Sequence, residues 1–367
     1  MLLKFYQQLK IHMILDSEKH KKIWKNIFTK YLKSYYDIYY HPEYVIMNCL
    51  KKKSKGCMFV YREKNLIWVH VFIKILLPNL TNKHKYYDLE TPYGYGGPLS
   101  NSSNKDFLLR ANMSFLTWAK KNSIVAEFLR FHPLYENQNK ILNTTMIENR
   151  FTCGISIDHT TKNYLFFKSK QRNLIKSANR NLVVRFSRNY KYFLRFKKTY
   201  LNLMIEKKAN KELFFSNTYF SNLYKFIKKN GFIARVVSKK NNDDVAYGIF
   251  LFSDKYAHYH LSAPCLKNYT PGSINLMIYK SLMFSKKLNK FFLHLGGGNS
   301  SSVDDTLFKF KQSMSNQLCS YKIGKRIFNK EFYDLNKKNW QKKYPMLSKT
   351  FSKYLLCYHL DDNILQK

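Results

Sequence analysis

The sequence contains few acidic residues, and its rarer residue types do not form the motifs of several large protein classes. Of 367 residues only 23 are Asp or Glu, against 64 Lys or Arg, which gives a formal net charge of +41. None of the six cysteines forms a CxxC pair, and no His, Cys or carboxylate cluster has ligand spacing, so we expect no metal site. Neither a GxGxxG fingerprint nor a P-loop GK[ST] motif occurs, which disfavours nucleotide hydrolysis.

Long apolar runs are also missing. The most apolar run, 66–77, is too short to span a bilayer and contains His70 and Lys74. The first fifteen residues lack the apolar core and small-residue cleavage site of a secretory signal. We therefore expect a cytoplasmic protein whose thiols are reduced and mostly buried, with no segment that crosses a membrane.

The residues that are abundant predict a folded chain of about two domains. With 45% hydrophobic and 17% aromatic residues, the chain can bury enough apolar surface to offset its conformational entropy. Its basic residues are 53 Lys and only 11 Arg. Because a dedicated nucleic-acid surface more often uses Arg, whose planar donors fit phosphates and bases, nucleic-acid binding is only weakly indicated. An anionic substrate or membrane surface fits the charge as well.

The first half of the chain has a mixed α and β pattern. Apolar residues at three- and four-residue steps predict a helix over 21–36, and a second helix is expected over 106–121. Two β-rich runs, 57–61 and 66–77, are separated by a polar turn and predict a hairpin. A further strand is expected over 125–130.

The stretch from 168 to 211 is strongly basic. It carries 14 Lys or Arg and one acid, Glu206, in a helical pattern that a strand over 182–186 interrupts. A solvated helix face and an anion-binding surface explain this charge equally well. Three strands, 232–237, 245–252 and 256–262, then predict an antiparallel meander.

A crossover unit follows the meander: a loop from Ala263, a helix over 270–287 and a strand over 291–295. Thr270 can cap this helix, with Pro271 at its first position. The turn from Thr270 to Ser273 would expose backbone amides that can hold a phosphate or carboxylate. An ordinary capped helix is the simpler interpretation.

Three successive glycines, 296–298, come next. They let the backbone approach a ligand closely, and they equally suit a flexible turn. Ser302 with Asp305 three residues later has the capping-box pattern, which predicts a helix over 303–317.

Four segments stand in order along the chain: DIYYHPEY at 37–44, TPYGYGGP at 91–98, EFLRFHP at 127–133, and HLGGG at 294–298 followed by LFKFK at 307–311. Together they resemble the FemAB-like branch of the GNAT acyltransferase superfamily, also described as BioF2-like or lipid II:glycine glycyltransferase-like. The resemblance extends from about residue 37 to 330, which is most of the chain.

This resemblance implies an α+β fold made of two tandem GNAT-like subdomains, each a mostly antiparallel sheet flanked by helices. Residues 1–152, completed by 318–345, would form the first subdomain, on the acceptor side. Residues 153–317 would form the second, on the acyl-donor side, and 346–367 a C-terminal tail. The implied reaction is transfer of an acyl or aminoacyl group to an amine.

The resemblance also implies site residues. Lys311 is similar to the lysine that stabilises developing negative charge, or a donor phosphate, in Fem-type ligases. Arg172 and Lys176 lie in a segment similar to the family's basic helix, which approaches the phosphate of a nucleotide-linked acceptor. Beside these segments, His294, His260 and Asp304 are candidate bases.

The remaining candidates are contacts to the two substrates. Those expected at the acceptor are Tyr93, Tyr95, Gly96, Gly97, Arg130, His132 and, again, His260. Those expected at the donor are Thr270, Gly272, Ser273, Gly297 and Gly298. A tight Gly/Pro turn with buried tyrosines explains 93–98 equally well.

The sequence departs from the family in two respects. Leu99-Ser100-Asn101 replaces the acid that follows the Gly-Pro turn in some Fem ligases, and the helical arm that holds charged tRNA is not evident. We therefore expect acyl-CoA, such as acetyl-CoA, as donor, without a metal. The expected acceptor is a phosphorylated or lipid-linked amine, such as an amino sugar or nucleotide-linked sugar of cell-envelope polysaccharide synthesis.

Two other interpretations stay open. The first is an aminoacyl-tRNA-dependent ligase that acts on a peptidoglycan precursor. The second is a non-catalytic basic protein that binds RNA or an anionic membrane. In each case the protein would act in the cytoplasm or peripherally at the inner face of the membrane. The sequence leaves the oligomeric state open.

Overall fold

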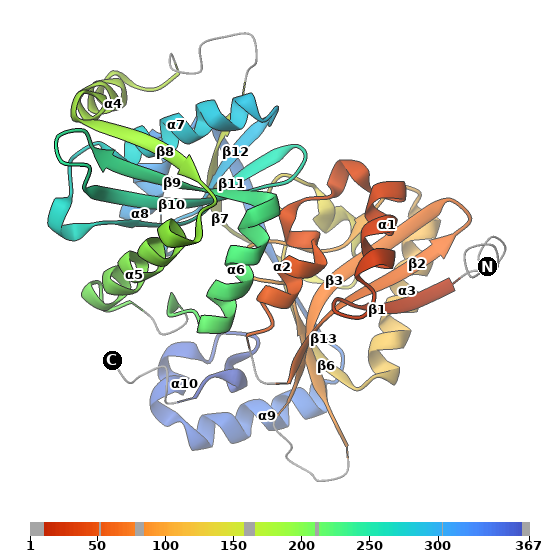
Figure 1. The fold of residues 1–367 in the computed structure, drawn as a ribbon. Coiled ribbons are helices and arrows are strands. Elements are labelled where there is room, and N and C mark those ends of the chain that lie inside the picture. The colour runs from red at the N-terminus through yellow and green to blue at the C-terminus, as the bar shows by residue number, and fades with distance from the viewer. Residues whose placement is uncertain are drawn as a thin grey trace. The chain divides into compact units, whose positions relative to one another are not determined.

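The computed structural model describes residues 11–50, 53–77, 84–157, 166–209, 213–302 and 304–361. The chain divides into two compact units, Met1–Glu148 with Tyr321–Lys367 (unit 1), and Asn149–Ser320 (unit 2). The boundaries fall within strands β7 (Thr145–Ser156) and β13 (Gln317–Ile327). Each unit combines a sheet with helices, as Figure 1 shows.

Unit 1 is built on a mostly antiparallel sheet. Its strand order is β1 (Ile11–Asp16), β2 (Ser54–Glu63), β3 (Leu66–Leu76), β4 (Tyr87–Glu90), β6 (Ile124–Arg130) and β13, and β5 (Leu99–Ser100) pairs with β3. The β2–β3 pair is the predicted hairpin. Neighbouring strands are antiparallel except β4 and β6, which are parallel.

The helices of unit 1 cover this sheet with their apolar sides. They are α1 (Lys21–Tyr31), α2 (Pro42–Met47), α3 (Lys105–Lys121), α9 (Lys330–Lys343) and α10 (Pro345–Phe351). Helix α3 buries Phe115 and Trp118 against Phe59 and Phe72 of the β2–β3 hairpin. The segment expected as a C-terminal tail packs in this unit as far as it is described, and Leu347 is fully buried.

A buried ion pair joins the neighbouring strands β6 and β13 of the unit 1 sheet. Arg326 of β13 donates through Nη2 to Glu127 Oε2 of β6 at 2.6 Å, and both side chains are at most 2% exposed. His70 of β3 contacts the other carboxylate oxygen. Burial alone would raise the pKa of Glu127, but the positive charge of Arg326 and the hydrogen bonds with His70 and Arg326 outweigh burial and lower it to about 2.

Unit 2 repeats the same general plan. Its strand order is β7, β12 (Phe292–Gly296), β11 (Tyr256–Pro264), β10 (Asp244–Phe252), β9 (Gly231–Ser238) and β8 (Leu182–Ser187). The predicted meander is present as β9, β10 and β11, which are antiparallel. The helices are α4 (Ser169–Asn181), α5 (Tyr190–Glu206), α6 (Asn217–Asn230), α7 (Ser273–Lys287) and α8 (Thr306–Ser313).

Each unit contains one strand–helix–strand crossover. In unit 1, β4 leads through α3 to the parallel strand β6. In unit 2, β11 leads through α7 to the parallel strand β12, which confirms the predicted crossover. Two parallel strands need such a long connection, because the chain must return from the end of the first strand to the starting edge of the second, and a tight turn cannot do this. The loop after β4 contains Tyr93 to Gly97, and the loop after β11 contains Thr270 and Gly272.

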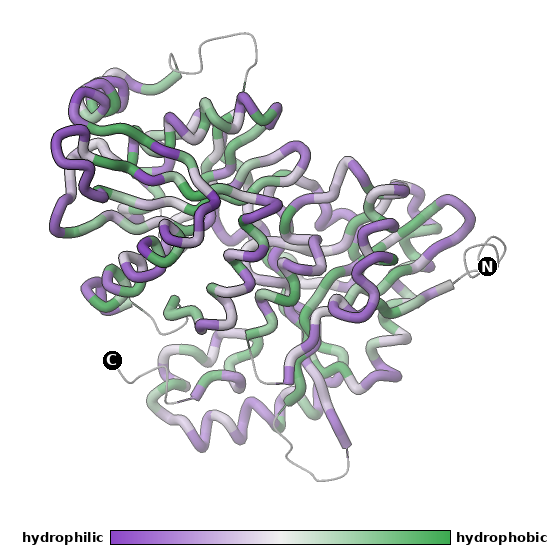
Figure 2. The backbone as a smooth tube through the Cα atoms, viewed as in Figure 1, coloured by the Kyte–Doolittle hydropathy of each residue, from purple (hydrophilic) through white to green (hydrophobic). Residues whose placement is uncertain are grey.

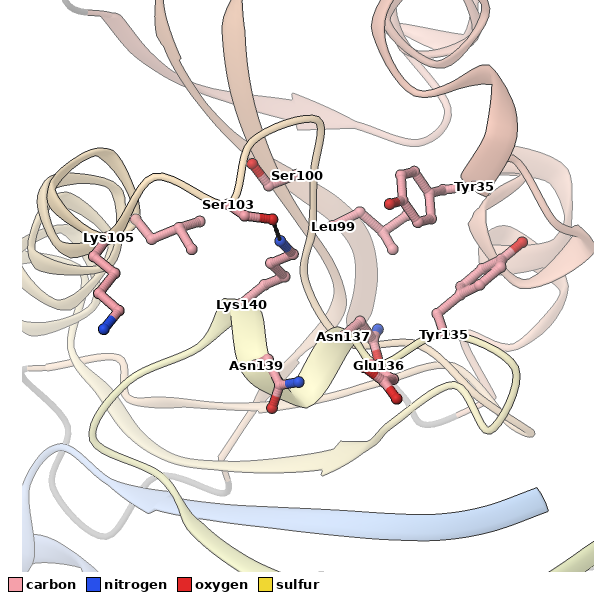
Figure 3. Close-up of a pocket in the computed structure, with 11 residues that line it drawn as sticks. Tyr35, Leu99, Ser100, Ser103, Lys105, Tyr135, Glu136, Asn137, Asn139 and Lys140 are labelled. Carbon is pink, nitrogen blue, oxygen red and sulfur yellow. Dashed lines mark hydrogen bonds between the residues drawn. The ribbon is translucent and has the colours of Figure 1, made fainter.

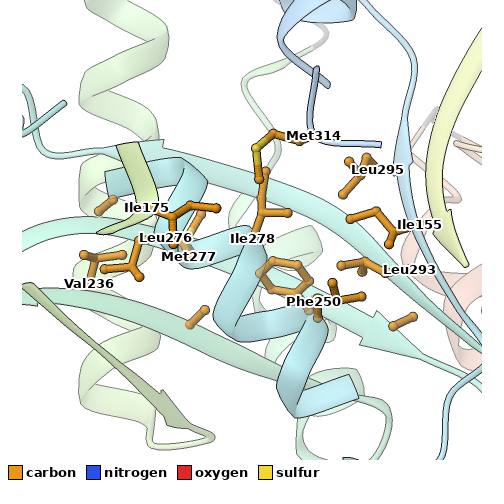
Figure 4. Packing of buried hydrophobic residues seen from close by; sticks show 14 of the residues in the cluster. Ile155, Ile175, Val236, Phe250, Leu276, Met277, Ile278, Leu293, Leu295 and Met314 are labelled. Carbon is orange, nitrogen blue, oxygen red and sulfur yellow. The ribbon is translucent and has the colours of Figure 1, made fainter. Parts of the chain in front are cut away.

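The core of unit 2 lies between its sheet and helices α4 and α7. Met277 and Ile278 of α7 pack against Phe250, Leu293 and other strand residues, as Figure 4 shows. Helix α5, by contrast, alternates between hydrophilic and hydrophobic colours along its length in Figure 2, as an amphipathic helix does. Among the described helices none is both long and apolar enough to cross a bilayer.

Two predicted helix starts are wrong. Helix α7 begins at Ser273 after Gly272, which takes a left-handed conformation (φ 79°), while the Thr270 hydroxyl donates to Asn268 O instead of capping the helix. Helix α8 begins at Thr306 with Asp305 as its N-cap, so Ser302 is not the cap, and it ends at Ser313. Val303, the predicted first residue, lies outside the described residues.

Candidate functional site

A glycine-containing loop follows β12 in unit 2 and leads to α8. This glycine loop, Gly296–Ser302, begins with Gly296 at a positive φ of 78°, where a side chain would be strained. Asp305 ties the loop to the start of α8, because its Oδ2 accepts from Asn299 N and Ser300 N, both at 2.9 Å. Its Oδ1 accepts from Phe308 N at 2.8 Å. The loop is therefore held in one shape from both ends.

Lys311 of α8 reaches back to this loop. Its Nζ donates to Gly297 O at 2.7 Å. Burial lowers the pKa of Lys311 to about 8, because the charged ammonium loses hydration. The group is thus still mostly protonated at neutral pH, and its charge is poorly shielded by water. An ammonium in this setting can stabilise an anion that forms beside it.

A second cation contacts the same loop. Arg150 of β7 donates through Nη1 to Gly298 O at 3.2 Å. Lys311 and Arg150 therefore bind two successive carbonyls. A Cβ built on Gly298 would lie only 2.3 Å from Asp305 Oδ1, so a residue with a side chain does not fit there. These contacts make Gly297 and Gly298 part of one positively charged site with Lys311.

Asp305 and Arg150 are residues of this site whose roles the sequence did not indicate. Burial would raise the pKa of Asp305, but hydrogen bonds from Phe308, Ser300 and Asn299 outweigh burial and lower it. The carboxylate is therefore ionised and fixes the loop as an acceptor. An acid directly before a helix is a usable sequence signal for an N-cap. In this sequence the capping-box spacing of Ser302 and Asp305 favours Ser302 as the cap instead.

His294 is buried on β12 beside Thr152 of β7, with 2.9 Å between His294 Nε2 and Thr152 Oγ1. The Thr152 hydroxyl donates its proton to Cys319 O at 3.3 Å. It then accepts from His294, so Nε2 carries the imidazole proton. This arrangement favours a positioning role for His294.

The backbone N of Asp304 donates to Ser302 Oγ at 3.1 Å, but its carboxylate points to Lys309 and not to the glycine loop. Its side chain is 81% exposed and pairs with Lys309 at 2.8 Å. The hydrogen bond and charge of Lys309 lower the pKa of Asp304, so its carboxylate is a weak base. We do not retain Asp304 as a catalytic candidate.

His260 of β11 contacts the hydroxyl of Tyr219, which belongs to α6, at 2.8 Å. Burial, with a smaller contribution from His258, lowers the pKa of His260 to about 3. The imidazole is therefore neutral at physiological pH and too weak a base for efficient proton transfer. No described contact joins His260 to Lys311.

The start of α7, where a donor phosphate was expected, is crowded by α4. A Cβ built on Gly272 would lie 2.7 Å from the Leu174 carbonyl oxygen of α4. Ser273 is fully buried, and its backbone N donates to Thr270 O at 3.1 Å. Asn275, one turn into α7, donates to Gln171 Oε1 of α4 at 2.6 Å. The helix start is thus packed against protein.

Arg172 and Lys176 differ in their surroundings, although both belong to α4. The Arg172 guanidinium donates to Phe167 O and, at 3.2 Å, to Ser169 Oγ, so it stabilises the start of its own helix. Lys176, one turn later, is exposed. Lys176 is accordingly the better candidate for a phosphate contact.

The 93–98 segment of unit 1 forms a tight turn on buried tyrosines. Gly97 has a positive φ of 89°. Gly96 N donates to Arg130 O at 2.7 Å, and Gly96 O accepts from Tyr40 Oη at 2.9 Å. Tyr95 packs edge-on against Tyr39 with 5.2 Å between ring centroids, while Tyr93 is 42% exposed. The turn is well supported, and of its two tyrosines Tyr93 is the more accessible to a ligand.

Arg130 and His132 end β6 and are held by protein contacts. Arg130 donates to Thr91 O at 2.9 Å. His132 Nδ1 accepts from Leu134 N at 3.2 Å, so its proton is on Nε2 and is donated to Asp37 Oδ2 at 2.8 Å. Both His132 and Asp37 are fully buried. These contacts favour a structural role for the His132–Asp37 pair.

The described residues contain no group of three or more His, Cys, Asp or Glu side chains that could hold a metal ion. Cys153 of β7 lies near Lys311, yet burial raises the pKa of its thiol to about 11. A thiol that stays protonated is a poor nucleophile. The site therefore favours direct transfer over a covalent cysteine intermediate.

No family model matches the sequence, and no curated protein is significantly similar to it. Solved structures do share the fold. FemX aligns with a TM-score of 0.62 and 12% identity, over 89% of this chain and 99% of its own. The C-terminal domain of a protein described as a lysylphosphatidylglycerol synthetase from Agrobacterium fabrum aligns with a TM-score of 0.53 and 9% identity, over 87% and 94%.

A tandem GNAT protein from the clavulanic acid biosynthesis pathway aligns with a TM-score of 0.52 and 6% identity, over 88% of this chain and 99% of its own. At such identities the likeness concerns the fold. It confirms the predicted mixed fold with mostly antiparallel sheets, which this chain shares with FemX and the tandem GNAT protein.

Proposed function

We propose that this protein transfers an acyl or aminoacyl group to an amine, and that Lys311 stabilises the oxyanion formed on the way. The observation that carries this proposal is the contact of Lys311 Nζ with Gly297 O at 2.7 Å. It places a partly desolvated ammonium beside the glycine loop, where it can stabilise an anion. The shared fold and the similarity of LFKFK to the Fem-type segment support the same role.

The chemistry follows from the charge that develops. A neutral amine attacks the donor carbonyl, a C–N bond forms, and the carbonyl oxygen becomes an oxyanion. Lys311 has three N–H donors, so it can contact Gly297 O and the oxyanion together. The oxyanion then collapses, the C–S or C–O bond to the donor breaks, and the proton from the amine ends on the leaving thiolate or alkoxide.

Proton transfer need not use a protein base. His294 Nε2 is a donor to Thr152, and His260 has a pKa of about 3. The departing group, or water, can therefore take the amine proton directly. Arg150 and Lys311 together raise the local positive charge, which lowers the energy of the anionic intermediate.

Two donors fit this chemistry. Acyl-CoA is the donor that the sequence favours, with Thr270, Gly272 and Ser273 holding its phosphates. The packing of α4 on Gly272 weighs against that cradle, because a Cβ built on Gly272 would lie only 2.7 Å from the Leu174 carbonyl oxygen. The packing thus supports aminoacyl-tRNA, the second candidate, whose reacting group is a ribose ester and which would use the basic surface of the chain.

The acceptor is proposed to be a phosphorylated or lipid-linked amine of cell-envelope synthesis. Exposed Lys176 of unit 2 supports this assignment, since its charge suits a phosphate group. Peripheral contact with an anionic membrane would suit a lipid-linked acceptor.

Thermal unfolding of the full chain tests the donor directly. Acetyl-CoA, CoA, charged tRNA and uncharged tRNA are added separately, at low and at physiological salt. A ligand of the folded state at a hundredfold excess over its Kd adds about 2.7 kcal/mol of stability, which is measurable. A salt-resistant shift with acetyl-CoA identifies the acyl-CoA transferase, and a shift with charged tRNA beyond that of uncharged tRNA identifies the ligase. Equal, salt-sensitive shifts with every polyanion would instead favour the non-catalytic basic protein.

A further inference from the structure

A cavity of about 380 Å³ lies in unit 1, next to the 93–98 turn, since its lining residue Tyr135 stacks on His132 and its lining residue Asn137 donates to Gly96 O. It is enclosed by four short segments: the one-turn helices η1 (Lys33–Tyr35) and η3 (Asn137–Lys140), β5, and the first turns of α3. Figure 3 shows the lining side chains, with Lys105 and Lys140 toward one side and Tyr35 and Tyr135 toward the other. We call it the η3 pocket. Its volume lies in the usual range for small-molecule sites.

One wall of the η3 pocket is positively charged. Lys140 Nζ donates to Ser102 O at 3.0 Å and to Ser103 Oγ at 2.9 Å, and both partners are neutral. Burial lowers the pKa of Lys140, which indicates that its ammonium is partly removed from water. Lys105, the first residue of α3, lines the same cavity.

Glu136 is the acid among the described lining residues, so the two lysines leave a net positive charge. A bound anion stabilises an ammonium whose hydrogen bonds go to neutral oxygens more than it stabilises an ammonium that is already paired with a carboxylate. The wall therefore suits a small anion such as a phosphate group.

The other wall is aromatic and rigid. The rings of Tyr35 and Tyr135 meet edge to face with 5.3 Å between centroids. Tyr135 is itself fixed by stacking on His132 at 4.1 Å, and it is only 9% exposed. Leu99 and Leu108 add a buried apolar surface. Such a wall can pack against the C–H face of a sugar ring, and each tyrosine also places a polar hydroxyl group at the end of its ring.

We propose that the η3 pocket binds a monosaccharide phosphate, with its phosphate at Lys140 and Lys105 and its ring against Tyr35 and Tyr135. Ser103 and Asn139, which also line the cavity, offer hydrogen-bonding groups to sugar hydroxyls. The cavity volume favours one sugar over an oligosaccharide or a folded polymer. This inference does not depend on the proposed transferase activity, because it concerns binding to unit 1 alone.

The test is calorimetric binding of glucose 6-phosphate, glucose and inorganic phosphate to the full chain at physiological salt. Glucose 6-phosphate should bind at least about tenfold more tightly than either fragment, because charged and ring contacts act together. Trp68 gives a second readout, since its Nε1 donates to Lys140 O at 2.8 Å and its fluorescence should respond to the filled pocket.

The variants are Lys105→Met and Lys140→Met, with Lys120→Met as control. Lys120 is exposed near the far end of α3, about 22 Å from Lys105 at 1.5 Å per residue. Each pocket variant should weaken glucose 6-phosphate binding about tenfold or more, and the control should not. Lys105 is exposed, so its variant folds even if Lys140→Met does not.

Three outcomes would overturn the proposal: no binding at millimolar glucose 6-phosphate, equal affinity for inorganic phosphate, or the same loss in Lys105→Met and Lys120→Met. The last two would indicate that any anion binds the basic surface of the chain. None of these measurements uses an acyl donor. Their result therefore tests sugar phosphate binding and does not test the proposed transferase activity.

Discussion

The lowered pKa of Lys311 predicts that acyl transfer weakens in mildly alkaline solution, and that Lys311→Arg removes this weakness. Lys311 must be charged to stabilise an oxyanion, and burial brings its pKa to about 8. Above that value the charged fraction falls roughly tenfold for each pH unit. The value of kcat/KM should therefore reach a plateau below pH 8 and lose about tenfold by pH 9, once ionisation of the acceptor amine is accounted for.

Arginine at position 311 keeps its charge at every pH of the assay, because its pKa exceeds about 12. The alkaline limb should then disappear from the profile, even if the longer side chain lowers the plateau. Lys309→Arg is the matched control, since Lys309 lies two residues earlier on α8 and is 57% exposed. That variant should retain the wild-type limb.

The assay measures initial rates from pH 6 to pH 10 with hydroxylamine as a small amine acceptor and with the donor that stabilises the protein. A wild-type profile that stays flat to pH 10 would refute the assignment of Lys311 as the essential cation. So would an alkaline limb that persists unchanged in an active Lys311→Arg variant. If the arginine variant is inactive, the wild-type limb alone decides.

Two further predictions concern the fold around the sites. Gly298→Ala should lower both Tm and turnover, because its Cβ would lie 2.3 Å from Asp305 Oδ1. The Cβ of Gly297→Ala would meet its nearest neighbour at 3.3 Å, so this variant should lower Tm less. Equal Tm values for the two variants would contradict this steric argument. Glu127→Gln should destabilise unit 1 by about 3–5 kcal/mol, since it leaves the Arg326 charge buried without its partner. A change of less than about 1 kcal/mol in the free energy of unfolding, measured in urea, would contradict this.

The same Glu127 predicts how stability depends on acid. Its pKa is about 2 in the folded protein and near the ordinary value of 4.5 in the unfolded chain. The stabilisation is therefore complete above about pH 4.5 and is lost as pH falls through that value toward 2. Wild-type protein should lose stability in this window, and the Glu127→Gln variant should lose less, as measured by urea unfolding between pH 2 and pH 6.

The sequence predicts those parts of the fold that depend on local periodicity. The β2–β3 hairpin, α3, the β9–β11 meander and the β11–α7–β12 crossover each follow from apolar spacing within one short segment. Such patterns are local, because one face of each element must be buried whatever its partner is. The resemblance to the FemAB-like branch added the tandem arrangement, which periodicity alone does not give.

Helix starts could not be predicted as well, because several residues compete for the same cap. Thr270 and Ser302 are both good caps by type, yet Gly272 and Asp305 occupy those positions. At Gly272 the chain turns through a left-handed conformation under α4, and this depends on packing between segments a hundred residues apart. Tertiary contacts decided both cases.

The candidate site could be predicted only in part for the same reason. Lys311 and the glycines were indicated by their motif, and the structure joins Lys311 to Gly297. Arg150 could not be found, because it stands on β7, far from the motif in sequence. Residues such as His132 looked functional by type, but a buried partner, Asp37, accounts for its hydrogen bonding.

The measurement that tests the central claim most directly is the single-turnover rate of acyl transfer in Lys311→Met and Lys309→Met. Hydroxylamine is the acceptor, the stabilising donor is used at saturation, and the uncatalysed rate is subtracted. Loss of one oxyanion donor costs about 2.7–4 kcal/mol, so Lys311→Met should react about 10²–10³ times more slowly than wild type, while its Tm is unchanged or higher. Lys309→Met should react at the wild-type rate. Near-normal turnover of Lys311→Met would contradict the account.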